Sequence, residues 1–280
     1  MNALSPATDR SAQDVAITAE RVETKYLIDA SRLPALKRAI AAELESHRFT
    51  GEAANRLPDA QHFVTTIYFD TPSAHYFKAA KSSAQSNVKI RAKEYYDLHP
   101  SLAELATDPE QILRYQPWLW FELKRREGQT TSKRRFRFPK AAAGALFDDN
   151  REPYDLPQAG QERSDAEALM AHVSAQGERI APSAIVNYQR LSFQNPDSTL
   201  RVTIDLGLSF FAVPADLFRR ARPLSRGELG RPAGVEPRAV IEVKRRSALP
   251  AWLEQALARA SGQSVSFSKF VAATEALVGK

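Results

Sequence analysis

The chain has 280 residues, 26% of them charged and 43% hydrophobic, which is ordinary for a folded globular protein with a sizeable core. It has a net charge of +6 and no cysteine, and no apolar run approaches the roughly 20 residues that span a bilayer. These features exclude a disulfide scaffold and a transmembrane helix. Because the N-terminal segment also lacks the apolar region of a signal peptide, we expect a cytoplasmic protein.

Hydrophobic periodicity divides the chain into alternating strands and helices after a polar N-terminal segment. Residues 1–18 are small and polar and predict a disordered leader, and residues 19–280 show no clean internal boundary, which predicts a single domain. In the first half we expect strands over 20–28, 62–70 and 87–96, helices over 31–46 and 71–81, and a hairpin of 118–127 with 132–138. In the second half we expect helices over 140–148, 163–177, 250–261 and 266–278, and strands over 184–193, 200–208 and 239–245.

Two local signals refine these expectations. Thr71 before Pro72 is typical of a helix N-terminus, and Ser266 is a candidate cap for the last helix. Residues 98–116 are acidic and contain proline, and we expect them to be helical in part. Consecutive strands with short returns favour antiparallel pairing, and about eight can close into a barrel. The sequence therefore predicts an α+β fold, an eight-stranded antiparallel β-barrel tunnel with flanking helices.

Basic residues recur at every second position along the predicted strands, often beside a glutamate. The clearest sets are Lys89-x-Arg91-x-Lys93, Glu122-x-Lys124-x-Arg126, Lys133-x-Arg135-x-Arg137 and Glu242-x-Lys244-x-Arg246. Successive side chains on a strand point to opposite faces, so each set lies on one face and apolar residues lie on the other. The basic face must meet either solvent or a cavity. If it lines a barrel interior, that interior suits a ligand rich in phosphate.

The separate pieces also allow less specific interpretations. Lys89, Arg91 and Lys93 are compatible with a solvated edge strand, where lysine discourages aggregation. Glu122 and Glu242 stand in near copies of one pattern, apolar-Glu-apolar-Lys. Each could hold a divalent metal or balance the positive charge of the neighbouring lysines. We favour the metal role for Glu242 and leave both roles open for Glu122. Lys269 could be an ordinary surface lysine or could lie at the anion-attracting start of the last helix.

Several familiar sites are missing from the sequence. There is no P-loop, no GxGxxG motif and no cysteine or histidine cluster, and the five histidines are scattered without ligand spacing. Phe121, Phe136 and Phe138 are predicted on the face opposite to the charges, which disfavours base stacking and hence nucleic-acid binding. We therefore expect no nucleic-acid partner and no histidine-based hydrolase.

Taken in order, these segments resemble the VTC domain, the polyphosphate polymerase branch of the triphosphate tunnel (CYTH-like) superfamily. The resemblance covers about residues 20–275. The matching segments are Glu23-Thr24-Lys25-Tyr26, Thr66-Ile67-Tyr68-Phe69-Asp70-Thr71-Pro72, Lys89-Ile90-Arg91-Ala92-Lys93, Phe121-Glu122-Leu123-Lys124, Lys133-Arg134-Arg135, Tyr188-Gln189-Arg190, Leu200-Arg201-Val202-Thr203-Ile204-Asp205, Val240-Ile241-Glu242-Val243-Lys244 and Ser268-Lys269-Phe270. The resemblance implies a basic tunnel that handles ATP or polyphosphate with Mn²⁺ or Mg²⁺.

The resemblance also implies roles for individual residues, to which the basic strand pattern adds several more. Residues expected to act in catalysis are Lys25, Arg91, Lys93, Lys124, Arg190, Arg201 and Lys269. Residues expected to bind substrate are Lys89, Lys133, Arg135, Tyr188, Lys244 and Ser268, while Glu242 is expected to hold the metal. Two positions depart from the family pattern. Arg21 replaces the earlier of two alternating glutamates, which weakens the case for a hydrolase and favours a polymerase. Lys93 replaces the usual arginine and lacks the planar guanidinium that can form two hydrogen bonds to one phosphate.

The sequence therefore predicts a metal-dependent polyphosphate polymerase that transfers the γ-phosphoryl group of ATP to a growing chain. Its expected partners are ATP and polyphosphate, with no membrane segment in this chain. Two alternatives remain open: a tripolyphosphatase or nucleoside triphosphatase that uses the same tunnel, and a polyphosphate-binding module without catalysis.

Overall fold

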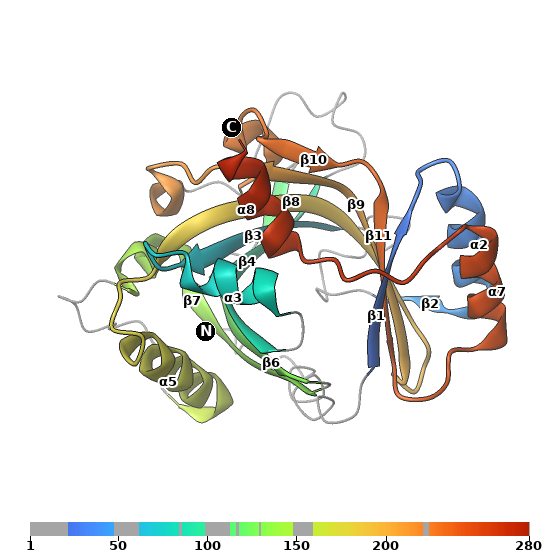
Figure 1. Ribbon diagram of the computed structural model, residues 1–280, viewed down its shortest axis with the longest axis horizontal. Coiled ribbons are helices and arrows are strands. Elements are labelled where there is room, and N and C mark those ends of the chain that lie inside the picture. Colours follow the sequence, from blue (N-terminus) through green and yellow to red (C-terminus); the bar gives the residue numbers. More distant parts are fainter. Residues whose placement is uncertain are drawn as a thin grey trace, which may run out of the picture.

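The computed structural model describes residues 22–47, 62–83, 86–98, 113–115, 118–128, 130–147, 159–220 and 224–279. Its strands form one antiparallel sheet, in which eight follow the order β1-β11-β9-β8-β3-β4-β6-β7 (Figure 1). These eight are β1 (Val22–Ile28), β3 (His62–Asp70), β4 (Ser86–Leu98), β6 (Trp118–Glu127), β7 (Thr130–Pro139), β8 (Ala181–Gln194), β9 (Leu200–Phe211) and β11 (Ala239–Arg245). The expected α+β fold with eight principal antiparallel strands is confirmed. The predicted leader and Arg21 lie outside the described residues.

Three short strands lengthen the sheet beside this path. β2 (Glu45–Ser46) pairs with β8, β5 (Leu113–Tyr115) with β4, and β10 (Gly234–Glu236) with β9. The sequence predicted none of them, because a strand of two or three residues is too short to show periodicity. β5 lies in the 98–116 stretch that we expected to be partly helical, and the rest of that stretch beyond Leu98 is outside the described residues apart from 113–115.

The helices flank this sheet at the expected places in the chain. They are α2 (Leu33–Glu43), α3 (His75–Ser82), α5 (Gly160–Ser174), α6 (Arg226–Leu229), α7 (Ala251–Arg259) and α8 (Lys269–Val278), with 3₁₀ turns η2 (Lys140–Ala145) and η3 (Leu217–Arg219). The sequence predicted neither η3 nor α6. The helix expected over 140–148 is the 3₁₀ segment η2 instead. The helix expected over 31–46 ends at Glu43 because the chain turns extended at Leu44 and enters β2.

Two predicted helix starts are wrong. α3 begins at His75 rather than at Thr71, because the Asp70 carboxylate accepts the backbone N–H groups of Tyr76 and Phe77 and so caps the helix from the end of β3. α8 begins at Lys269, and its N-cap is Ser268 rather than Ser266. The residues before it run extended along β1, since the Val265 N–H donates to the Lys25 carbonyl.

The sheet is strongly curved, and its two terminal strands are not hydrogen-bonded to each other in the described part of the chain. Across this gap Lys124 of β6 reaches Glu23 of β1, with 3.6 Å between Lys124 Nζ and Glu23 Oε2. A charged contact therefore joins one terminal strand, β1, to the strand next to the other terminal strand, β7.

The outer face of the sheet is covered by two apolar clusters. Ile28, Ile241 and Val243 pack with α2 and α7, which lie together beside β1 and β11 in Figure 1. Phe121, Phe136 and Phe138 are buried in the second cluster, which includes residues of η2 and α5. The prediction that these aromatic residues face away from the charges is therefore confirmed.

Helix α8 packs on the inner face of the curved sheet. The ring of its Phe270 stacks on Tyr68 of β3, with 4.9 Å between the centroids, and Lys269 points into the interior. The basic residues at every second strand position line the part of the interior that α8 does not fill. Their sequence neighbours Ile90, Ala92 and Leu123 are buried on the opposite side of the sheet.

Candidate active site in the tunnel

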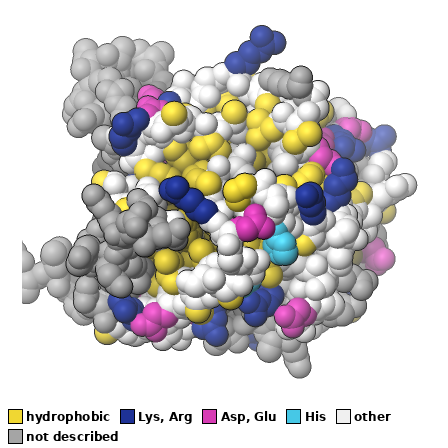
Figure 2. Space-filling view, turned by 60° about the vertical axis from the view of Figure 1, so that its left-hand side comes forward, with side chains coloured by type: hydrophobic (Ala, Val, Ile, Leu, Met, Phe, Trp, Pro, Cys, Tyr) yellow, Lys and Arg dark blue, Asp and Glu magenta, His cyan; other side chains and the backbone are white. Residues whose placement is uncertain are grey.

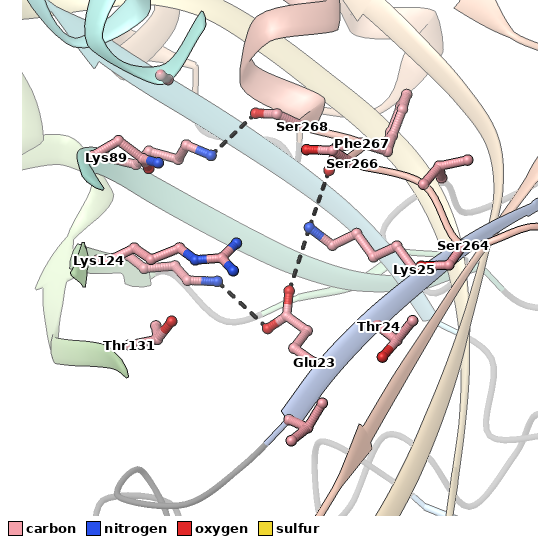
Figure 3. Close-up of a pocket in the computed structure, with 15 residues that line it drawn as sticks. Glu23, Thr24, Lys25, Lys89, Lys124, Thr131, Ser264, Ser266, Phe267 and Ser268 are labelled. Atoms are coloured by element: carbon pink, nitrogen blue, oxygen red, sulfur yellow. Dashed lines mark hydrogen bonds and ion pairs between the residues drawn. The ribbon is translucent and has the colours of Figure 1, made fainter. Parts of the chain in front are cut away.

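The interior of the curved sheet contains two adjacent cavities that share lining residues. The outer cavity has a volume of about 430 Å³ and is lined by residues of β1, β4, β6 and β7 and by Ser264–Ser268 (Figure 3). The inner chamber is smaller, about 90 Å³. Four residues line both spaces, and we call them the neck: Lys25, Lys89, Lys124 and Ser268.

The inner chamber is dominated by positive charge. Its lining consists of Lys25, Tyr68, Lys89, Arg91, Lys93, Lys124, Tyr188, Arg190, Glu242, Lys244, Ser268 and Lys269. Eight of these twelve residues are lysine or arginine, and Glu242 is the one acidic residue among them. Figure 2 shows a contrasting outer face, where hydrophobic side chains gather near the centre and charged ones are scattered. The cations of the alternating strands are therefore gathered inside the molecule.

Glu122 holds one group of these cations. Arg91 donates to its carboxylate from both Nε and Nη2, at 2.7 and 2.6 Å, and the nitrogens of Lys93 and Arg135 approach it at 3.7 Å. Burial raises the pKa of Glu122, but the neighbouring cations outweigh burial and hold that pKa well below its usual range. Glu122 thus contacts three cations and lines neither cavity, an arrangement that balances their charge.

Asp205 holds the second group from the other side of the chamber. Arg190 donates to it through Nε and Nη2 at 2.6 and 2.7 Å, and Lys269 donates to the same carboxylate. Both cations also lie over the ring of Tyr188, with 5.2 and 4.7 Å to its centroid. Asp205 is fully buried, and although burial raises its pKa, Arg190 and Lys269 lower it to about 2. This arrangement fixes the orientation of a guanidinium group in the chamber wall.

Two further carboxylates lie on the paired strands β1 and β11. Glu242 faces Lys25 in the strand register and binds Lys244 at 2.7 Å, while Glu23 contacts Lys25 at 3.3 Å and Lys124 at 3.6 Å. Figure 3 shows Glu23 between these two lysines. Burial and Glu242 raise the pKa of Glu23, but Lys124, Lys244 and Lys25 outweigh them and lower it to about 2. Burial raises the pKa of Glu242 too, but Lys244 and other cations hold that pKa well below its usual range, so both carboxylates are ionised at neutral pH.

The described residues contain no cluster of three or more acidic or histidine side chains that could enclose a metal ion. Glu242 and Glu23 nevertheless fit a hard divalent cation, because Mg²⁺ is commonly held by one or two carboxylates together with water and substrate phosphates. The residues present thus supply part of the ligand set of such a cation and leave its other positions to water or to a bound ligand.

Two lysines of the neck have unusually low pKa values. Burial together with the charges of Lys25, Lys124 and Arg91 lowers the pKa of Lys89 to about 7, although Glu23 opposes this shift. Burial likewise lowers the pKa of Lys124 to about 8, although Glu23 raises it. The neck thus carries more basic groups than its carboxylates can balance.

Three of the expected site residues line neither cavity. Arg201 donates to Gln194 at 2.6 Å and lies beside Lys244 in the strand register. Arg135 stacks on Trp120, with 3.8 Å from Cζ to the ring centroid, and Lys133 is opposite Lys124 on β7. The inner chamber or the neck contains the other expected residues, namely Lys25, Lys89, Arg91, Lys93, Lys124, Tyr188, Arg190, Glu242, Lys244, Ser268 and Lys269.

The sequence interpretation missed three features of the interior. Asp205, Glu23 and Tyr68 appeared only within the segments that carry the family resemblance, and no role was predicted for any of them. For Asp205 a signal was present, because it shares a strand face with Arg201 at a spacing of four residues. Its pairing with Lys269 joins residues 64 positions apart in the chain and could not be predicted locally.

The fold and the interior define the class of protein, an antiparallel β-tunnel with a cation-lined chamber. The chain belongs to the VTC domain family, whose model matches residues 20–278. The resemblance inferred from the sequence is thereby confirmed. No curated protein matches the chain.

Similar solved structures are distant in sequence. A candidate adenylyl cyclase from Hippeastrum with a dominant triphosphatase activity is 13% identical, with 94% of this chain and 97% of that chain covered and a TM-score of 0.47. A candidate adenylate cyclase from Bacillus halodurans is also 13% identical, with coverages of 88% and 94% and a TM-score of 0.42. The PH1819 protein from Pyrococcus horikoshii is 9% identical, with 86% of each chain covered and a TM-score of 0.35. Within the described residues, no helix is long and apolar enough to cross a membrane.

Proposed function

We propose that this protein is a metal-dependent polyphosphate polymerase, which transfers the γ-phosphoryl group of ATP to the end of a polyphosphate chain. The observation that carries this proposal is the 90 Å³ chamber with eight cations in its wall. A space of this size and charge suits a few linked phosphates, and membership of the VTC domain family supports the same substrate class. Burying so many cations is costly without a counter-anion, and a polyanionic ligand supplies one.

In the proposed reaction, a terminal phosphate oxygen of the chain attacks the γ-phosphorus of ATP in line. The bond between that phosphorus and the β,γ-bridging oxygen breaks, and ADP leaves with the electron pair. The attacking oxygen is already anionic at neutral pH, so no general base is required. Arg91 and Arg190, held by Glu122 and Asp205, position and neutralise the phosphates, as expected where electrostatics dominates catalysis. A metal held by Glu242, with Glu23 beside it, would neutralise further charge on the phosphate oxygens.

A triphosphatase is the second candidate. Arg21 removes one carboxylate of the family pattern, but Glu23 remains next to Glu242 and lines the outer cavity. This second carboxylate is the observation that favours hydrolysis, because it could orient a water molecule toward the phosphate. In that reaction free phosphate would accumulate and no chain would grow.

The decisive experiment incubates the purified protein with ATP and Mn²⁺ and resolves the products on a polyacrylamide gel stained for polyanions. A ladder that an exopolyphosphatase removes supports the polymerase, whereas free phosphate without a ladder supports the triphosphatase. Tight polyphosphate binding without turnover would indicate a binding module.

Three variants connect the outcome to the site. Arg190→Ala and Glu242→Gln should abolish turnover, and Glu242→Gln should retain polyphosphate binding because it removes only negative charge. Arg163→Ala is the control, since this exposed arginine on α5 pairs with Glu167 at the surface, outside both cavities. Full ATP-dependent activity in Arg190→Ala would contradict the assigned site.

A further inference from the structure

The neck contains one lysine whose surroundings differ from those of its neighbours. Lys25 and Lys124 both contact Glu23, and nearby Arg91 is bound by Glu122. Lys89 has no such partner, because no carboxylate of the described residues lies within ion-pair distance of its Nζ. Among those residues its polar contact is with Ser268, at 3.1 Å between Lys89 Nζ and Ser268 Oγ (Figure 3).

The charges that act most strongly on Lys89 lie on three strands. Lys25 lies on β1, Arg91 on β4 and Lys124 on β6, and all three disfavour a further positive charge, while Glu23 on β1 favours it. From the fourth side, α8 presents the Ser268 hydroxyl, which also accepts the Val271 N–H. A hydroxyl in this position can donate to a neutral amine or accept from an ammonium group, so the contact with Ser268 suits both protonation states of Lys89.

Lys89 lines both the outer cavity and the inner chamber, so a polyanion passing through the neck must come close to its amine. A phosphate there supplies the negative charge that the surroundings lack, and an opposite charge within a few ångströms favours the protonated lysine. We propose that Lys89 binds a phosphate oxygen at the neck and takes up a proton from solvent as the polyanion arrives, a role that rests on the proposed function. Ligand binding and proton uptake are then a single linked event at this site.

The size of the effect follows from the low pKa of about 7. At pH 8 only about a tenth of the Lys89 side chains carry a proton before ligand binds, so saturating the site takes up about 0.9 proton per ligand. At pH 6 Lys89 is already protonated and its uptake falls to about 0.1. Because this uptake accompanies binding, Lys89 by itself makes the affinity decrease as pH rises through 7 and 8.

The test is isothermal titration of the full chain with inorganic tripolyphosphate at pH 8, in buffers of different ionisation enthalpy. The buffer dependence of the heat gives the number of protons taken up per ligand. Lys89→Arg keeps a positive charge that cannot be lost near neutral pH, so it should lower the uptake by about 0.9 proton. Lys124 repels a positive charge at position 89, so Lys89→Arg also increases the uptake by Lys124, and the measured decrease is at most about 0.9 proton.

Lys25→Arg is the matched control. It changes another lysine of the neck, but Lys25 is paired with Glu23 and its pKa is raised, so the proton uptake should equal that of the unchanged protein. Equal uptake in Lys89→Arg and the unchanged protein would overturn the inference. If Lys89→Arg does not fold, the unchanged protein still decides through NMR titration of Lys89 with and without tripolyphosphate, because a Lys89 pKa that does not rise on binding would also overturn the inference. Absence of any tripolyphosphate binding would instead refute the proposed function itself.

Discussion

The buried carboxylate of Asp205 provides the sharpest test of how the chamber is held together. It is fully buried and receives two hydrogen bonds from Arg190 and one from Lys269. Asp205→Asn preserves the shape of the side chain but leaves these two cations without their counter-charge. Removing one partner of a buried ion pair costs about 3–5 kcal/mol, which for a domain of this size lowers Tm by about 10 °C.

The same reasoning predicts how the ligand acts on this variant. A bound polyanion supplies the negative charge that the substitution removes, so tripolyphosphate should raise the Tm of Asp205→Asn more than that of the unchanged protein. The assay is thermal unfolding by circular dichroism at low ionic strength, with and without tripolyphosphate. Glu167→Gln is the control, because it breaks an exposed helical pair with Arg163 that is worth only about 0.3–0.5 kcal/mol. A Tm of Asp205→Asn within about 2 °C of the unchanged protein would refute the argument, as would equal ligand shifts in the two proteins.

Three further predictions concern other parts of the molecule. Glu94→Gln breaks a buried 2.7 Å pair with Lys140 away from both cavities, so Tm should fall while the activity per folded molecule measured at low temperature stays unchanged. Ser268→Ala removes the cap of α8 and the partner of Lys89, and should cost about 0.5–2 kcal/mol in urea unfolding, which Ser268→Thr should largely restore. The folded-state pKa values of Asp205 and Glu23, about 2, lie below the unfolded values near 4. The stability that these two carboxylates contribute to the folded protein is therefore complete above about pH 5 and is lost as pH falls toward 2. Urea unfolding between pH 2.5 and 6 measures that loss, and a constant free energy of unfolding would contradict it.

Sequence reasoning succeeded where a local pattern has one physical solution. Alternation of Lys89, Arg91 and Lys93 with Ile90 and Ala92 determines which side chains share a strand face, because the side-chain period of a strand is two. It also requires the apolar side to be buried. The long strands, the antiparallel pairing and the gathering of the cations on one face follow from this pattern.

Helix boundaries were predicted less well, because distant groups decide them. α3 begins where the carboxylate of Asp70 receives its N–H groups, so the Thr71-Pro72 signal was overridden by a residue of the preceding strand. α8 begins only after residues 264–266 have run along β1, a constraint that no pattern near Ser266 reveals. Capping propensity is worth about 1 kcal/mol and yields to such tertiary contacts.

The strand faces, the family and most of the residues around the chamber can be recognised from the local sequence alone. How those residues pair with one another depends on contacts between distant strands. Glu122 and Glu242 occupy near-identical sequence patterns, yet Glu122 is enclosed by Arg91, Lys93 and Arg135, whereas Glu242 lines the chamber. The physical reason is that electrostatic roles depend on distances across the curved sheet, between strands that are far apart in the chain, and a one-dimensional pattern does not contain those distances.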